Sequence, residues 1–149
     1  LTTGAYCWYN NDLSTYAKYG ALYNWFTVAD SRGICPQGWH VPTDAEWTML
    51  TTYLGGTSDA GGKMKSVSAV WTSPNTDATN NSGFSGFPVG LRYYLGNFIY
   101  LGLNGSWWSS TEYSSGTSWY RGLYNNHGYV GVYDNIKENG YSVRCLRDN

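Results

Sequence analysis

The chain has 149 residues, a net charge of −1 and only 13% charged residues. This length suffices for one domain with a proper hydrophobic core. Because no Lys- or Arg-rich run occurs, we expect no nucleic-acid partner. No apolar run reaches the roughly 18–20 residues that a membrane span requires, so membrane anchoring would depend on segments outside this chain. The many aromatic residues (18%) and 19 glycines are common in secreted or surface β-rich domains.

Two segments predict helices, residues 15–29 and residues 42–56. The first repeats aromatic side chains at three- and four-residue spacing, which gives one apolar face. The second begins with Thr43 and Glu46 at capping-box spacing and ends at a Gly-Gly pair. The expected buried positions are Tyr16, Tyr19, Leu22, Tyr23 and Phe26 in the first helix and Trp47, Leu50 and Leu54 in the second.

Beyond the second helix the sequence predicts long loops and then a β meander. Residues 57–86 are rich in Gly, Ser, Asn and Thr and are interpreted as loops, whereas strands dominate from Phe87 onward. Asn-Gly pairs at 104–105 and 139–140 predict turns, and residues 141–146 then alternate as a strand. The order of elements predicts an α+β fold in a single domain, residues 1–149.

Three cysteines, Cys7, Cys35 and Cys145, limit the covalent chemistry. Since none has the CxxC spacing of common zinc sites, we expect no metal. One disulfide and one free thiol is the simplest arrangement, and a Cys35–Cys145 bond would tie the chain end to its middle. A loop of that length contributes about 4–5 kcal/mol in the chain-entropy model. The alternative is three buried free thiols that pack as small hydrophobic groups.

The segment near residues 113–138 has the composition of a binding surface. Residues 113–135 contain five Tyr, three Asn, three Ser and four Gly, a mixture that antibody loops also use. Tyr supplies rigid contact area, Asn and Ser supply adaptable hydrogen bonds, and Gly permits unusual backbone shapes. Arg121, His127 and Asp134 are candidates for charge-specific contacts. The alternative is an ordinary meander whose tyrosines merely cover the sheet.

Three separated motifs carry a resemblance to a known family. Residues 19–50 (YGALYNWFTVADSRGICPQGWHVPTDAEWTML), 107–113 (WWSSTEY) and 140–148 (GYSVRCLRD) together resemble the Fibrobacter succinogenes major paralogous domain. That family looks like a branch of the C-type-lectin-like fold related to formylglycine-generating enzymes. The resemblance implies two helices packed on a twisted antiparallel sheet with long loops.

The final segment resembles the variable regions of diversity-generating retroelement target proteins. In such proteins adenine-containing codons are mutagenised, so that Asn codons yield Tyr, Ser, Asp, His, Gly or Ile. The implied fixed framework is Trp119, Leu123, Val130, Lys137 and Gly140. The implied varied, ligand-binding face is Gly122, Tyr124, Asn125, Asn126, His127, Tyr129, Gly131, Tyr133, Asp134 and Asn135.

Catalysis is not expected, and no cofactor is implied. Glu46 and Glu112 could in principle pair as the acid and base of a glycosidase. Structural roles explain them better, Glu46 as a helix cap and Glu112 as a hydrogen-bond acceptor. His40 is expected to be a packed histidine that satisfies a nearby backbone group rather than a metal ligand. The related formylglycine-generating enzymes use a cysteine pair at a copper or redox centre, whereas Cys35 and Cys145 belong to scaffold motifs here.

A calcium-dependent sugar site is not expected either, because the Glu-Pro-Asn, Gln-Pro-Asp and Trp-Asn-Asp triplets of C-type lectins are missing. Trp107, Trp108 and Trp119 are more consistent with core than with a sugar-stacking surface. The sequence therefore predicts a non-enzymatic module that binds a protein or surface glycan, located extracellularly or on a bacterial cell surface. The alternatives are a fixed carbohydrate-binding or adhesin module and a purely structural domain.

Overall fold

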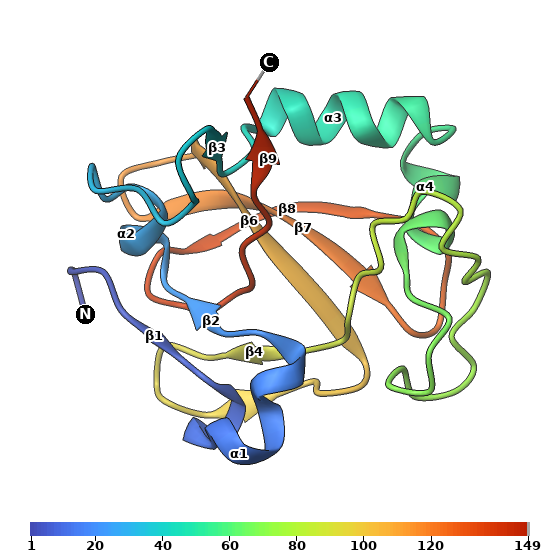
Figure 1. Cartoon of the computed structure of the whole chain (residues 1–149), viewed down its shortest axis with the longest axis horizontal. Helices are drawn as coiled ribbons and strands as arrows, with labels where there is room; N and C mark the ends of the chain where they lie inside the picture. Colours follow the sequence, from blue (N-terminus) through green and yellow to red (C-terminus); the bar gives the residue numbers. More distant parts are fainter. Residues whose placement is uncertain (149) are drawn as a thin grey trace.

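A computed structural model describes residues 1–148 (Figure 1). It combines short helices with small antiparallel sheets, as the predicted α+β class requires. The helices are α1 (Leu13–Tyr16), α2 (Trp25–Val28), α3 (Asp44–Tyr53) and α4 (Thr57–Met64), with 3₁₀ helices η1 (Tyr9–Asn11) and η2 (Ala17–Tyr19). The strands are β1 (Tyr6–Cys7), β2 (Leu22–Tyr23), β3 (Trp39–His40), β4 (Leu91–Arg92), β5 (Phe98–Ile99), β6 (Asn104–Glu112), β7 (Thr117–Tyr124), β8 (Gly131–Ile136) and β9 (Leu146–Arg147).

The largest sheet is the antiparallel meander β6–β7–β8. Three two-stranded sheets, β1–β2, β3–β9 and β4–β5, surround it. In Figure 1, α3 runs along the top of the view above the meander, and α4 lies at its right-hand end. Since successive side chains of a strand point to opposite faces, Trp107 and Trp108 on β6 enter different cores.

The two faces of the meander are buried by different partners. Trp107 packs with Leu123 and Trp47 in the core between the sheet and the helices α3 and α4. Trp108, which is fully buried, packs with Trp25 and Tyr141 on the opposite face. The prediction that Trp107 and Trp108 are core residues is therefore confirmed.

Helix α3 forms as predicted, because its signals are local. The Thr43 hydroxyl accepts the N–H of Glu46, and the Glu46 carboxylate accepts the N–H of Thr43 at 2.8 Å, which completes the capping box. Trp47 and Leu54 are buried on its inner face. The helix ends before Gly55, whose φ is +104°.

Helix α4 lies in the segment that was predicted as loops, so that prediction is wrong for residues 57–64. Gly61 and Gly62 weaken the helical pattern, since each costs about 1 kcal/mol relative to Ala in a helix. Tertiary packing requires them. A Cβ atom on Gly61 would overlap the backbone oxygen of Tyr129, and one on Gly62 would overlap that of Asp77.

The single helix predicted over residues 15–29 is wrong. The chain instead forms α1 and η2, turns at Gly20 with φ of +85°, pairs as β2 and only then forms α2. Leu22 is fully buried in β2, opposite Cys7 of β1, and packs in a small core with Tyr9. The three- and four-residue aromatic spacing therefore arises from several short elements and not from one continuous helix.

The turn predicted at residues 104–105 is also wrong. Asn104 and Gly105 begin β6, and the turn precedes them, where the Tyr100 carbonyl accepts the N–H groups of Leu103 and Asn104, each at 3.0 Å. Strand β5 pairs with β4 rather than with β6. Gly105 is required by packing, because a Cβ there would lie 2.5 Å from the Phe87 carbonyl oxygen.

The end of the chain is less regular than the alternating strand that was predicted. Asn139 donates its N–H to the Ile136 carbonyl at 3.2 Å, so the turn spans residues 136–139. Its central residues, 137 and 138, precede the Asn-Gly pair. Tyr141 and Ser142 are both buried and make single bridges to neighbouring segments. A regular strand, β9, forms only at Leu146–Arg147, against β3.

The predicted Cys35–Cys145 disulfide is present, with the two Cα atoms 5.8 Å apart. It joins the segment before β3 to the segment before β9 and so anchors the end of the chain. Cys7 is free and partly buried. No helix among the described residues has the length and apolarity needed to cross a membrane.

Candidate ligand-binding face

Four aromatic side chains gather on and beside the outer end of the meander, and we call Tyr124, His127, Tyr129 and Tyr133 the tyrosine face. The His127 and Tyr129 rings stack in parallel with centroids 3.3 Å apart. The Tyr124 ring lies 4.6 Å from His127 and 5.7 Å from Tyr129. Tyr129 and Tyr133 remain 40% and 44% exposed, so they offer aromatic surface to a partner.

A row of small residues supports this face from below. Ser106, Gly122 and Gly131 lie side by side across β6, β7 and β8. A Cβ atom on Gly122 would lie 2.6 Å from the Tyr124 hydroxyl, and one on Gly131 would lie 2.7 Å from it. The two glycines are buried, so they shape the face from beneath instead of contacting a ligand directly.

The tyrosine face is continuous with the core. Tyr133 lies opposite Tyr120 with ring centroids 5.9 Å apart, and Tyr120 lies 4.7 Å from the Tyr141 ring. Tyr141 in turn packs on Trp108 at 4.4 Å. This chain of aromatic contacts limits the freedom of the exposed rings, which lowers the entropy lost on binding.

A buried lysine holds the loop that carries His127. Lys65, at the end of α4, is fully buried. Its Nζ donates to the carbonyl oxygens of Thr76 at 2.6 Å, Tyr124 at 2.8 Å and His127 at 3.0 Å. Burial lowers the pKa of Lys65 to about 8, an effect that nearby Asp77 opposes. One ammonium group therefore connects three chain segments.

The tyrosine face is uncharged near neutral pH. Burial, followed by the charge of Lys65, lowers the pKa of His127 below its ordinary value. Burial raises the pKa of Tyr124, and it also raises that of Tyr129. The face can therefore stack on a partner and exchange hydrogen bonds with it, but it offers no ionic contact of its own.

The remaining predicted contact residues fall into two groups. Asn126 and Asp134 are exposed. Asn125 and Asn135 are partly buried: the Asn125 amide donates to the Thr72 carbonyl at 3.3 Å, and the Asn135 amide donates to the Tyr141 hydroxyl at 2.8 Å. These two amides support the scaffold. The four residues nevertheless border the tyrosine face in sequence.

The prediction that Arg121 contributes a charge-specific contact is wrong. Its side chain is only 1% exposed and points to the helical side of β7. Its guanidinium donates to the Asp44 carboxylate at 2.6 Å and to the Thr48 hydroxyl at 3.2 Å. Arg121 therefore links α3 to the meander.

Most of the positions that the resemblance assigned to a fixed framework are buried. Leu123 and Val130 are buried in the core beneath the helices, and Lys137 and Gly140 are buried elsewhere. Trp119, predicted as core, is instead partly exposed and packs edge-to-face on the exposed Tyr113, with centroids 4.7 Å apart.

The side chains considered for catalysis have structural partners. Glu46 completes the α3 capping box, and Glu112 pairs with the buried ammonium group of Lys137. His40 does not satisfy a backbone group as predicted: its Nδ1 lies 2.6 Å from an Asp148 carboxylate oxygen, and its Nε2 lies 3.0 Å from a Glu46 oxygen. Within the described part of the chain, no group of three or more His, Cys, Asp and Glu side chains is arranged to hold a metal ion.

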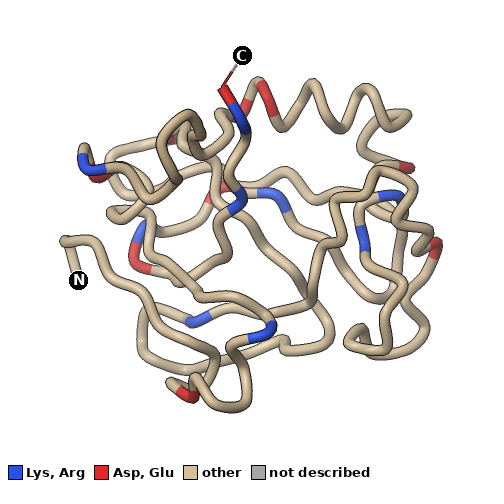
Figure 2. Tube along the Cα trace, in the orientation of Figure 1, with Lys and Arg blue, Asp and Glu red and all other residues tan. Residues whose placement is uncertain are grey.

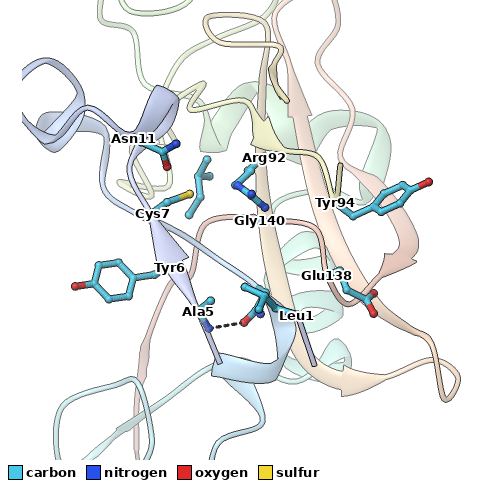
Figure 3. Close-up of a pocket in the computed structure, with 11 residues that line it drawn as sticks. Leu1, Ala5, Tyr6, Cys7, Asn11, Arg92, Tyr94, Glu138 and Gly140 are labelled. Carbon is cyan, nitrogen blue, oxygen red and sulfur yellow. Dashed lines mark hydrogen bonds between the residues drawn. The ribbon is translucent and has the colours of Figure 1, made fainter. Parts of the chain in front are cut away.

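A cavity of about 270 Å³ lies between the N-terminal segment and β4 (Figure 3). The Arg92 guanidinium points into it toward Gly140, and the Cys7 thiol lies on its wall. Burial raises the pKa of the Cys7 thiol, an effect that Arg92 partly opposes. Since the thiolate is the reactive form, Cys7 packs as a small apolar side chain and is poorly suited to act as a nucleophile.

Charged residues are sparse over the whole molecule. Figure 2 shows Lys and Arg scattered along the trace among Asp and Glu, without one basic side. Nothing in this distribution marks a surface for a polyanion.

The family match covers almost the whole chain. Residues 1–147 match the family model described as the Fibrobacter succinogenes major domain. The chain belongs to this family. No curated protein and no solved structure matches it significantly. The match to the Fibrobacter succinogenes major domain spans the tyrosine face, the disulfide and the helices together, so these features are parts of one family domain.

The sequence analysis missed Lys65, although it supports the site. Lys65 lies in a polar stretch, KMKS, that carries no spacing or motif typical of a buried ammonium group. Its partners are backbone carbonyls, which every sequence supplies equally. Only the approach of α4 to residues 76 and 124–127 makes this lysine special.

We predict that Lys65→Met destabilises the domain by about 3 kcal/mol, because three buried carbonyl groups lose their shared donor. The free energy of unfolding measured in urea checks this value. Hydrogen exchange should also become faster in residues 124–130. The matched control is Lys18→Met on the exposed surface, for which a change within about 0.5 kcal/mol is expected. Equal stability of the Lys65→Met variant and the wild type would contradict the assigned role.

We predict that His40 makes stability decrease as pH rises. The hydrogen bond to Asp148 and, to a smaller extent, the one to Glu46 raise the pKa of His40 above its ordinary value of 6.5. The folded protein therefore binds more protons than the unfolded chain above pH 6.5, so this contribution is complete below that pH and disappears above the raised pKa. His40→Gln should flatten the pH dependence of the unfolding free energy in this window. An unchanged slope would show that the contacts of His40 do not stabilise the fold.

Proposed function

We propose that this domain is a non-enzymatic ligand-binding module whose tyrosine face recognises a protein or a surface glycan. The observation that carries the proposal is the exposure of Tyr129 and Tyr133 on a firmly supported aromatic cluster. An ordinary solvent-covered meander has no need of four converging aromatic rings on one support. Exposed Tyr on a rigid scaffold is an efficient way to gain contact area at low entropic cost.

The geometry of the face favours stacking and hydrogen bonding over ionic contacts. Tyr129 and Tyr133 supply ring surface and hydroxyl groups, and neighbouring Asn126 adds an exposed amide. Neutral, amphipathic contacts of this kind suit protein loops and sugar rings alike. No covalent chemistry is needed, and the carboxylates of Glu46 and Glu112 are already engaged.

We further propose that the scaffold is a C-type-lectin-like fold displaying a retroelement-diversified surface. Support comes from the separation of the two residue classes. Leu123, Val130 and Lys137 are buried, whereas most of the positions assigned as varied are exposed or partly exposed. Replacements at Gly122 and Gly131 would meet the far ends of tyrosine side chains first. Variation there would therefore reshape the face with less disturbance of the backbone.

The second candidate is a fixed carbohydrate-binding or adhesin module. The parallel His127–Tyr129 stack favours it, because flat aromatic surfaces accept the apolar faces of sugar rings. In either case we place the domain outside the cell or on the bacterial surface. The Cys35–Cys145 disulfide supports this location, since such bonds persist mainly in oxidising compartments.

The diversified and fixed alternatives make different predictions for natural sequence variation. We expect deep sequencing of the gene region that encodes residues 113–138, across one bacterial population, to show substitutions at the codons for Tyr124, His127, Tyr129 and Tyr133. They should match adenines in a neighbouring near-copy of the segment, while the codon for Leu123 stays constant. An invariant coding region for residues 113–138, without a near-copy nearby, would eliminate diversification and leave the fixed binder.

We predict that the double variant Tyr129→Ala/Tyr133→Ala keeps the fold and loses binding. Both side chains are substantially exposed, so the expected change in unfolding free energy is about 1 kcal/mol or less. Arrays of glycans and of bacterial surface proteins, probed with the wild type, should give hits that weaken at least about tenfold with the variant. The matched control is Tyr53→Ala, an exposed tyrosine on α3. Hits that survive the double variant would place binding elsewhere on the molecule.

A further inference from the structure

A second cavity, of about 430 Å³, lies where three distant segments meet. These are residues 19–23 around β2, residues 85–89 before β4, and residues 142–144 near the chain end. The first and third belong to the motifs on which the family resemblance rests, and the tyrosine face does not involve them. The volume is within the usual range for small-molecule sites, about 300–1,000 Å³. The principal lining side chains are Tyr19, Tyr23, Phe87, Trp107, Ser142 and Arg144.

Ser142 lies in the wall of this cavity, with its hydroxyl oxygen enclosed by the protein. The residue is only 7% exposed, and its Oγ has no hydrogen-bond partner among the described residues. Its backbone is already engaged, because its N–H donates to Ser106 at 2.9 Å and its carbonyl accepts from Trp108 at 3.1 Å. Because less than 1 Å² of the Oγ is accessible, Ser142 shapes the wall of the cavity and is not counted as a polar contact for a ligand.

Arg144 brings a positioned positive charge. Its guanidinium lies over the Phe84 ring at 4.6 Å, and its Nη2 donates to the Phe84 carbonyl at 2.9 Å. No carboxylate of the described residues lies within ion-pair distance of it. These two contacts orient the guanidinium and leave its other N–H groups available to an anion.

The walls of the cavity are aromatic. Tyr19 and Phe87 pack edge-to-face with centroids 6.3 Å apart, and Trp107 contributes from the sheet. Such walls suit the flat, apolar face of a six-membered ring. We propose that this cavity binds a small carboxylate built on a six-membered ring. The ring packs on Tyr19 and Phe87, and the carboxylate pairs with Arg144.

This ligand chemistry has two sources, a uronic acid and a non-sugar ring acid. The test is an NMR titration of the ¹⁵N-labelled domain with glucuronate, cyclohexanecarboxylate and glucose, read at the Ser142 amide and the Trp107 indole. We expect at least one of the two carboxylates to shift both signals and glucose to bind at least about tenfold more weakly. The carboxylate that binds more tightly identifies the source. If neither carboxylate shifts these signals at about 10 mM, or glucose binds as tightly, the proposal is overturned.

Variants locate the binding. Arg144→Gln should weaken binding of the carboxylate about tenfold, because the ligand loses its positively charged partner. The matched control is Arg147→Gln, an exposed arginine on β9 that does not line the cavity. The Tyr129→Ala/Tyr133→Ala variant should bind the carboxylate like the wild type, so the two sites can fail separately. Equal weakening by Arg144→Gln and Arg147→Gln would reduce the effect to general charge attraction and contradict the proposed site.

Discussion

One buried ammonium group helps to hold the loop of residues 124–127, which carries part of the tyrosine face. The Nζ of Lys65 reaches three carbonyl oxygens, of Thr76, Tyr124 and His127, from segments that no regular sheet connects. An ammonium group has three N–H donors, so this arrangement uses all of them. Without it, the carbonyls of Tyr124 and His127 would lose their buried donor. The exposed rings therefore depend on a residue that no ligand would touch.

The two sides of the meander have different surroundings. On its helical side, Arg121 ties β7 to α3 through Asp44, and Trp107 fills the core. On the other side, aromatic contacts run from Trp108 to the exposed Tyr133. Because the side chains of a strand alternate, β7 serves both sides at once. The exposed tyrosines are thus separated by the sheet from the core beneath the helices, which is consistent with the proposed binding function.

The sequence predicted those elements whose causes are local. Helix α3 has its capping box within four residues, so Thr43 and Glu46 are sufficient to locate its beginning. The aromatic spacing of residues 15–29 had no such cap and was misleading, because tertiary packing draws Leu22 into a strand. Helix α4 was missed for the opposite reason. Its glycines argue against a helix locally, and only the backbone at Tyr129 and Asp77 explains them.

The sequence by itself determined the α+β class and the family, and it favoured the Cys35–Cys145 disulfide, because composition, cysteine number and motifs are visible in the chain. The tertiary structure alone decided which residues face outward. It buried Gly122 and Arg121, exposed Tyr129 and Tyr133, and joined Ser142 and Arg144 to Tyr19 in one cavity. The physical reason is that the exposure of a side chain and its hydrogen-bond partners depend on which distant backbone segments lie next to it. Strand alternation, glycine contacts and buried polar bonds set that approach over separations that no local pattern encodes.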